Sequence, residues 1–126
     1  MIKIDVDTVR EVIREAMGAL RMLDYITLEV VIHGSSRDVK LEEIITDIRV
    51  IKGVATVSQD SIIKRSPTGR RVVNLIVSFD SKGTDSTEYI DMMAQEMKKN
   101  KFIDRIILKK LNDHPIRDDQ GRRIVY

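Results

Sequence analysis

The chain has 126 residues, of which 42% are hydrophobic and 33% are charged. This length fits one domain with one hydrophobic core and excludes two large ones. The 22 basic and 20 acidic residues leave a net charge of +2, so bulk charge gives no argument for nucleic-acid binding. The chain has no cysteine, which excludes disulfides, thiolate metal sites and cysteine nucleophiles. With no apolar run of about 18 residues, we expect no membrane span and no secretory leader.

Residues 1–24 predict an amphipathic helix, because their apolar residues recur at spacings of three and four and so share one stripe. The stripe consists of Val9, Val12, Ile13, Ala16, Met17 and Leu20. Acidic and basic residues are mixed on the opposite side, whereas a helix that binds membrane surfaces would be basic there. We therefore expect this stripe to pack either on the sheet of its own chain or on a partner subunit.

The middle of the chain reads as strand, helix, strand and strand. Residues 25–33 alternate as in a strand, and residues 38–52 carry a helical stripe that Gly53 should end. The β-branched segment 54–65, the turn 66–69 and the alternating segment 70–80 then predict a hairpin. Asp38 is the expected N-cap of this helix.

A second helix and a last strand complete the predicted domain. Asp85 and Glu88 have the spacing of a capping box, and a stripe of apolar residues follows at helical spacing. Residues 102–111 predict the last strand. Beyond them, Asp118 and Gly121 fit a type I turn, so residues 116–125 predict a hairpin. An isolated hairpin is marginal in water, and we expect it to lean on the edge strand of its own domain or on a neighbouring copy.

With right-handed crossovers, this order of elements predicts an α+β fold, the ferredoxin-like βαββαβ sandwich, in which two helices cover one face of a four-stranded antiparallel sheet. The prediction adds an N-terminal amphipathic helix and a C-terminal β-hairpin. The expected division is therefore 1–24 for the helix, 25–111 for the ferredoxin-like domain, and 112–126 for the hairpin or arm.

The sequence predicts no catalytic or metal site and no cofactor. His33, Ser35, Ser36 and Asp38 are ordinary residues of a strand-to-helix turn, and consecutive loop residues do not easily align a nucleophile, a base and a carboxylate. The two histidines, His33 and His114, are far apart in the sequence. No glycine-rich phosphate loop opens either helix. We therefore expect a protein that is not an enzyme.

Basic residues form a candidate patch around the central hairpin and the last strand. Its members are Lys64, Arg65, Arg70, Arg71, Lys109 and Lys110. Sheets that bind RNA stack bases on aromatic side chains of their central strands, but segment 69–76 has no aromatic residue. We interpret these cations chiefly as solvated charges that protect strand edges, with phosphate contact as the alternative.

Two segments resemble known families. Residues 41–59, LEEIITDIRVIKGVATVSQ, resemble the helix-turn-strand units of ACT domains and of the ligand-binding domains of leucine-responsive regulators. This resemblance implies small-molecule sensing and dimerisation through sheets, although residues 34–37 lack the Pro-Gly of ACT domains. Residues 10–17, REVIREAM, together with residues 47–54, DIRVIKGV, are similar to small proteins of tailed marine bacteriophages. That resemblance implies a viral accessory or virion component that works by protein contact.

These observations favour a non-enzymatic module for protein–protein interaction or assembly. Its partners would be copies of itself, as a homodimer or higher oligomer, or other assembly proteins in the cytoplasm or a viral particle, without a membrane. The candidate interface joins the N-terminal stripe to Val72 and Ile76 on the sheet face that the helices leave free. The alternatives are an ACT-like sensor of small molecules and a nucleic-acid-binding accessory protein.

Overall fold

The structure is a computed structural model of the 126-residue chain, and it describes residues 23–33, 41–59, 64–65 and 70–126. The predicted N-terminal helix therefore lies outside the described residues, with its stripe of Val9, Val12, Ile13, Ala16, Met17 and Leu20. The expected N-cap Asp38, the loop at Ser35 and Ser36, and the turn at 66–69 lie outside them as well.

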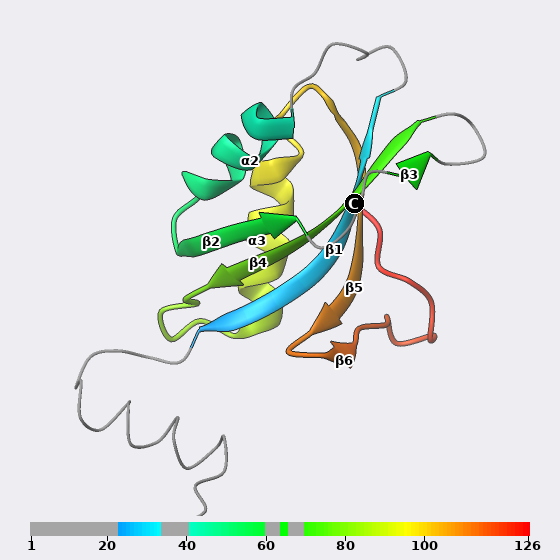
Figure 1. The fold of residues 1–126 in the computed structure, drawn as a ribbon. Coiled ribbons are helices and arrows are strands. Elements are labelled where there is room, and N and C mark those ends of the chain that lie inside the picture. Colours follow the sequence, from blue (N-terminus) through cyan, green and yellow to red (C-terminus); the bar gives the residue numbers. More distant parts are fainter. Residues whose placement is uncertain (1–22, 34–40, 60–63, 66–69) are drawn as a thin grey trace, which may run out of the picture.

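The described elements form one antiparallel sheet with two helices (Figure 1). In chain order they are β1 (Asp24–Ile32), α2 (Leu41–Arg49), β2 (Val54–Gln59), β3 (Lys64–Arg65), β4 (Arg71–Phe79), α3 (Ser86–Met97), β5 (Ile103–Leu111) and β6 (His114–Pro115). Five strands follow the order β2-β4-β1-β5-β6, and β3 pairs with β4 beside this path. Strand β1 is therefore central, between β4 and β5.

The core lies between the two helices and one face of this sheet. Alternate residues of β1 and β4 are buried, as expected for strands with one core face. The helices contribute their apolar stripes to the same cluster, and Figure 1 shows both on the same side of the sheet. The members from β1, β4, α2 and α3 are Ile26, Leu28, Val30, Ile32, Val73, Leu75, Val77, Phe79, Ile44, Ile48, Tyr89, Ile90, Met93, Ala94 and Met97.

Local signals in the sequence act near the helix ends, although α2 ends at Arg49, before the expected stop at Gly53. Gly53 has a φ of +93°, a backbone conformation that glycine adopts without strain, and it turns the chain from α2 into β2. Its carbonyl accepts a hydrogen bond from the Asp80 amide at 2.8 Å, and the Tyr89 hydroxyl donates to the neighbouring Lys52 carbonyl at 2.6 Å. At the start of α3, the Asp85 side chain accepts from the Thr87 amide at 2.8 Å, which confirms Asp85 as the N-cap.

The predicted fold class is wrong: the chain is not a four-stranded ferredoxin-like sandwich with a separate terminal hairpin. It is a small α+β fold whose sheet continues from β5 to β6 and carries β3 on β4, with two helices in the part of the chain described. The turn from Asp118 to Gly121 forms, with a 2.9 Å bond between the Gly121 amide and the Asp118 carbonyl.

The segments beside that turn do not build the expected hairpin at 116–125. Strand β6 pairs with β5, and Val125 forms a bridge with Ile107 of β5. The physical reason is that edge strand β5 offers unpaired backbone groups next to a hydrophobic core, whereas a lone hairpin has neither. The tail therefore closes one edge of the sheet.

Replacing Gly53 by alanine tests how much the α2 turn contributes to stability. An added Cβ would lie 2.7 Å from both the Asp80 carbonyl oxygen and the Tyr89 hydroxyl. We expect Gly53→Ala to lower the free energy of unfolding by roughly 2–3 kcal/mol, from backbone strain and this close approach. Gly121, with a φ of +76° and open space around it, is the matched control. Gly121→Ala should lower the free energy of unfolding, measured with urea, by only about 1 kcal/mol. Equal losses of stability for Gly53→Ala and Gly121→Ala would contradict the close-approach argument.

Candidate protein-docking surface

The face of the sheet opposite α2 and α3, called here the outer sheet face, carries an apolar strip. Because side chains alternate along a strand, the residues between the buried ones of β1 and β4 point to this face. Val31 pairs with Val72 across the two strands, and Ile76 pairs with Thr27 further along. On β5, Ile107 pairs with Glu29 and so points to the same face. Val31, Val72, Ile76 and Ile107 form the outer strip.

Three of the four residues of the outer strip remain partly exposed. Val72, Ile76 and Ile107 are half-buried, and Val31, at the centre of the sheet, is 4% exposed. Val125 continues the strip, since its bridge to Ile107 places it on the same face, and it is 49% exposed. Neither described helix covers this side (Figure 1). Apolar side chains on such a face indicate a surface for another protein segment.

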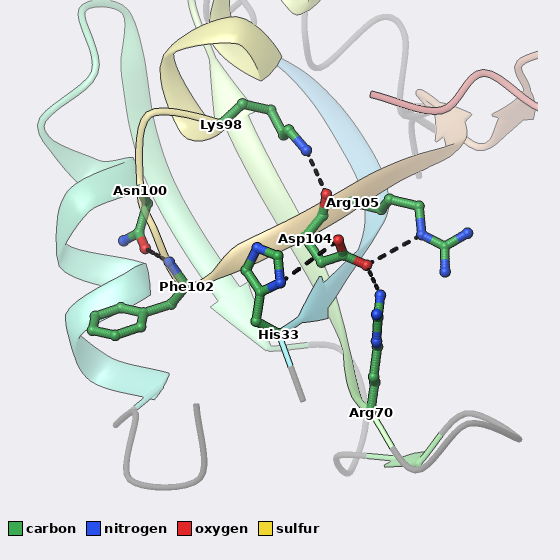
Figure 2. A network of polar contacts seen from close by, with 7 residues as sticks. All are labelled: His33, Arg70, Lys98, Asn100, Phe102, Asp104 and Arg105. Atoms are coloured by element: carbon green, nitrogen blue, oxygen red, sulfur yellow. Dashed lines mark hydrogen bonds and ion pairs between the residues drawn. The ribbon is translucent and has the colours of Figure 1, made fainter. Parts of the chain in front are cut away.

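Two groups of paired charges flank the outer strip. The first is an ion pair between the Lys109 amine and the Glu29 carboxylate, 2.6 Å apart. The second surrounds Asp104, the second residue of β5, whose carboxylate is 19% exposed. Figure 2 shows three side chains directed at this carboxylate, from Arg70, Arg105 and His33. Each carboxylate on this face therefore has a cationic partner.

The Asp104 cluster joins the ends of three strands and a helix. The Arg105 Nε atom lies 3.4 Å and the His33 Nδ1 atom 3.7 Å from the Asp104 carboxylate, and Arg70 also forms an ion pair with it. The Lys98 amine, just beyond α3, donates to the Asp104 carbonyl (Figure 2). These contacts tie the end of β1 to the starts of β4 and β5. The cluster thus has a structural role at the rim of the outer strip.

The predicted basic residues do not all come together. Pairing of β3 with β4 places the backbones of Lys64 and Arg65 beside those of Val72 and Arg71. Lys110 pairs instead with Thr27 of β1. Thr27 lies four residues from Val31, the β1 residue beside Val72, and four residues span about 13 Å of strand. Two members of the predicted patch, Arg70 and Lys109, are held by carboxylates.

Comparison with family models and with curated proteins found no match to this chain. The proposal for its function therefore starts from its own surfaces. Among the described residues, no group of three or more histidine, aspartate or glutamate side chains could hold a metal ion. No helix in the same part of the chain is long and apolar enough to cross a membrane.

Sequence reasoning missed two features of this surface. Asp104 interrupts an apolar strand, and that interruption was the available signal for a partly buried ion-pair cluster. Ile107 is the second feature: it lies between the buried Ile106 and Leu108 and therefore points to the outer face. The register shift between Val31 and Ile32 falls at Asp104, and residue alternation alone does not reveal such an irregularity.

The tail that adds Val125 to the face is held at its last residue. The Tyr126 backbone exchanges two hydrogen bonds with Ile106, at 3.0 and 2.8 Å, and its hydroxyl donates to the Asp91 carboxylate of α3 at 2.9 Å. Burial, reinforced by the bond to Asp91, raises the pKa of Tyr126 to about 12. The neutral phenol is therefore favoured in the folded chain.

This shift predicts a loss of stability at alkaline pH. Because the folded pKa exceeds the ordinary value of 10, the contribution of Tyr126 is complete below pH 10 and is lost as the pH rises toward 12. We expect the urea midpoint of the wild-type chain to fall more steeply between pH 9 and pH 12 than that of Tyr126→Phe. Parallel curves would contradict the role of this hydroxyl.

Proposed function

We propose that this chain is a non-enzymatic assembly module that associates with a second copy through its outer sheet face. The observation that carries the proposal is the outer strip of Val31, Val72, Ile76 and Ile107 on a face that neither described helix covers. Burying partly exposed valine and isoleucine side chains yields roughly 25 cal/mol for each Å² of apolar surface removed from water. This burial is the driving force that the proposal assigns to association.

The charged side chains around the outer strip can lie at the rim of a contact between two copies of the chain. The Glu29 and Asp104 carboxylates already have cationic partners within the same face. A stable contact needs about 1,000 Å² or more of total buried surface, with an apolar centre and a polar rim. The outer strip is the centre in this proposal, and the two charge groups are the rim.

The N-terminal stripe supplies further apolar surface for such a contact. Its sequence pattern is amphipathic, and the polar side mixes both signs of charge, as expected for a helix lying against the mixed rim of the outer face. In this proposal the stripe of Val9, Val12, Ile13, Ala16, Met17 and Leu20 from one copy covers the outer strip of the other. A virion component or another assembly protein would use a module of this kind.

Placing a charge in the outer strip tests the proposal. The full-length variant Val72→Glu with Ile76→Glu should weaken self-association in sedimentation equilibrium at least tenfold, because a carboxylate would have to be desolvated in the contact. The control Gln95→Glu with Gln120→Glu adds the same charge at exposed positions away from the strip and should associate like the wild type.

Circular dichroism checks that each variant is folded. Should the glutamate pair prevent folding, Val72→Thr with Ile76→Thr keeps β-branched side chains and removes apolar surface instead. A wild-type chain that stays at the mass of one 14.5 kDa copy at high concentration would overturn the proposal, as would a folded strip variant that associates normally.

A further inference from the structure

The two edges of the sheet are treated differently. At the β5 edge, β6 pairs with β5, and the tail adds backbone bonds from Ile106 to Tyr126 and from the Leu108 amide to the Ile124 carbonyl. At the other edge, β2 ends the sheet, and no strand in the described ranges pairs with its outer side (Figure 1). An outermost strand presents a row of backbone donors and acceptors to water or to another chain.

The composition of β2 leaves its part of this edge unprotected, since the charged strand β3 covers β4 only at Arg71 and Val72. Its sequence, VATVSQ, has no charged residue and no proline, the two devices that commonly prevent edge strands from pairing with other chains. Val57 is buried in the core, whereas Thr56 and Ser58 are exposed. A register shift lies between Val54 and Thr56, but from Thr56 onward the ladder with β4 is regular. This regular half of the strand has the geometry to accept one more strand.

Helix α2 lies over β2 and provides a second contact at the same edge. Asp47, on one side of the helix, accepts a hydrogen bond from Asn100 beyond α3, so that side faces α3. Glu42, Ile45 and Arg49 are spaced by three and four residues and therefore share the opposite side. These three residues are the α2 edge stripe. Ile45 is half-buried, and Glu42 and Arg49 are exposed.

The α2 edge stripe is complementary to its own reversed copy. An acidic residue stands at one end, a basic residue at the other, and an isoleucine near the middle. Within the described part of the chain, neither Glu42 nor Arg49 forms an ion pair. When two such helices lie antiparallel, each Glu42 faces Arg49 of the second copy, and the two Ile45 side chains meet. The occupant that fits this edge is therefore a second copy related by a two-fold axis.

We infer that two copies join edge to edge, with β2 antiparallel to β2 of the second copy and the two α2 edge stripes in contact. This inference rests on the proposed self-association and names a second contact for it. A two-fold axis normal to the sheet leaves both outer faces on the same side. The joined sheet thus presents two outer strips as one platform.

Charge reversal on α2 tests the inference, with the full-length chain as the sample. Glu42→Arg alone places arginine opposite arginine, and Arg49→Glu alone places glutamate opposite glutamate. Each variant alone should weaken the edge contact about five- to tenfold in sedimentation equilibrium. An equimolar mixture of the two single variants restores opposite charges across the axis, so it should associate nearly as tightly as the wild type.

A pair of substitutions on β2 also tests the strand contact. Because Ser58 pairs with Ile76, these substitutions lie beside the outer strip as well, and only the α2 charge reversals separate the two contacts. Thr56→Lys with Ser58→Lys adds like charges on both sides of the axis, and Gln95→Lys with Gln120→Lys is the matched control at exposed positions. Two different self-complementary contacts build a tetramer. We therefore expect the lysine pair on β2 to dissociate these tetramers, and the control to leave them unchanged.

The outcomes separate the edge inference from the proposed outer-face contact. If the charge-reversed α2 variants associate like the wild type, or if their mixture is no tighter than either chain alone, the edge inference is overturned and the outer-face proposal stands. If the charge-reversed α2 variants dissociate while Val72→Glu with Ile76→Glu has no effect, the edge inference stands and the outer-face proposal falls. A wild-type monomer overturns both.

Discussion

The arrangement of this chain depends on the burial of one face of the sheet by two helices. Ile26, Leu28 and Val30 of β1 pack beneath the stripes of α2 and α3 and are almost completely buried. Because successive side chains of a strand point to opposite faces, placing these residues on the core face also places their neighbours on the opposite face. Val31, Val72 and Ile76 lie on the outer face for that reason. The core therefore determines the composition of the proposed docking surface.

The two kinds of surface have different energetic roles. The core gains its stability from completely buried aliphatic and aromatic groups, such as Phe79 stacked on Tyr89 with ring centroids 4.6 Å apart. The outer face combines a narrow apolar strip with ion pairs around Glu29 and Asp104, whose side chains are 18% and 19% exposed. This mixture resembles the anatomy of a protein interface more than that of a core. It is consistent with a role in association.

Elements specified by local signals were predictable from the sequence. The α2 stripe and Gly53, the Asp85 cap and the alternation of β4 depend on residues within a few positions of one another. The expected contact of the tail with the edge strand of its own domain is confirmed. The separate hairpin at 116–125 was predicted wrongly, because the tail pairs instead with β5, which is distant from the terminal turn in the sequence. The Asp104 cluster also escaped prediction, since Asp104 lies at a register shift between β1 and β5.

The central claim, that the outer strip is buried when copies of the chain associate, has a direct test because the chain has no cysteine. The measurement is the rate at which a thiol reagent labels Ile76→Cys, compared with Gln95→Cys on the exposed side of α3, as the chain concentration is raised. The account predicts that labelling at position 76 slows with concentration while labelling at position 95 does not change. If the thiol reagent labels Ile76→Cys at the same rate at every chain concentration, the central claim is contradicted.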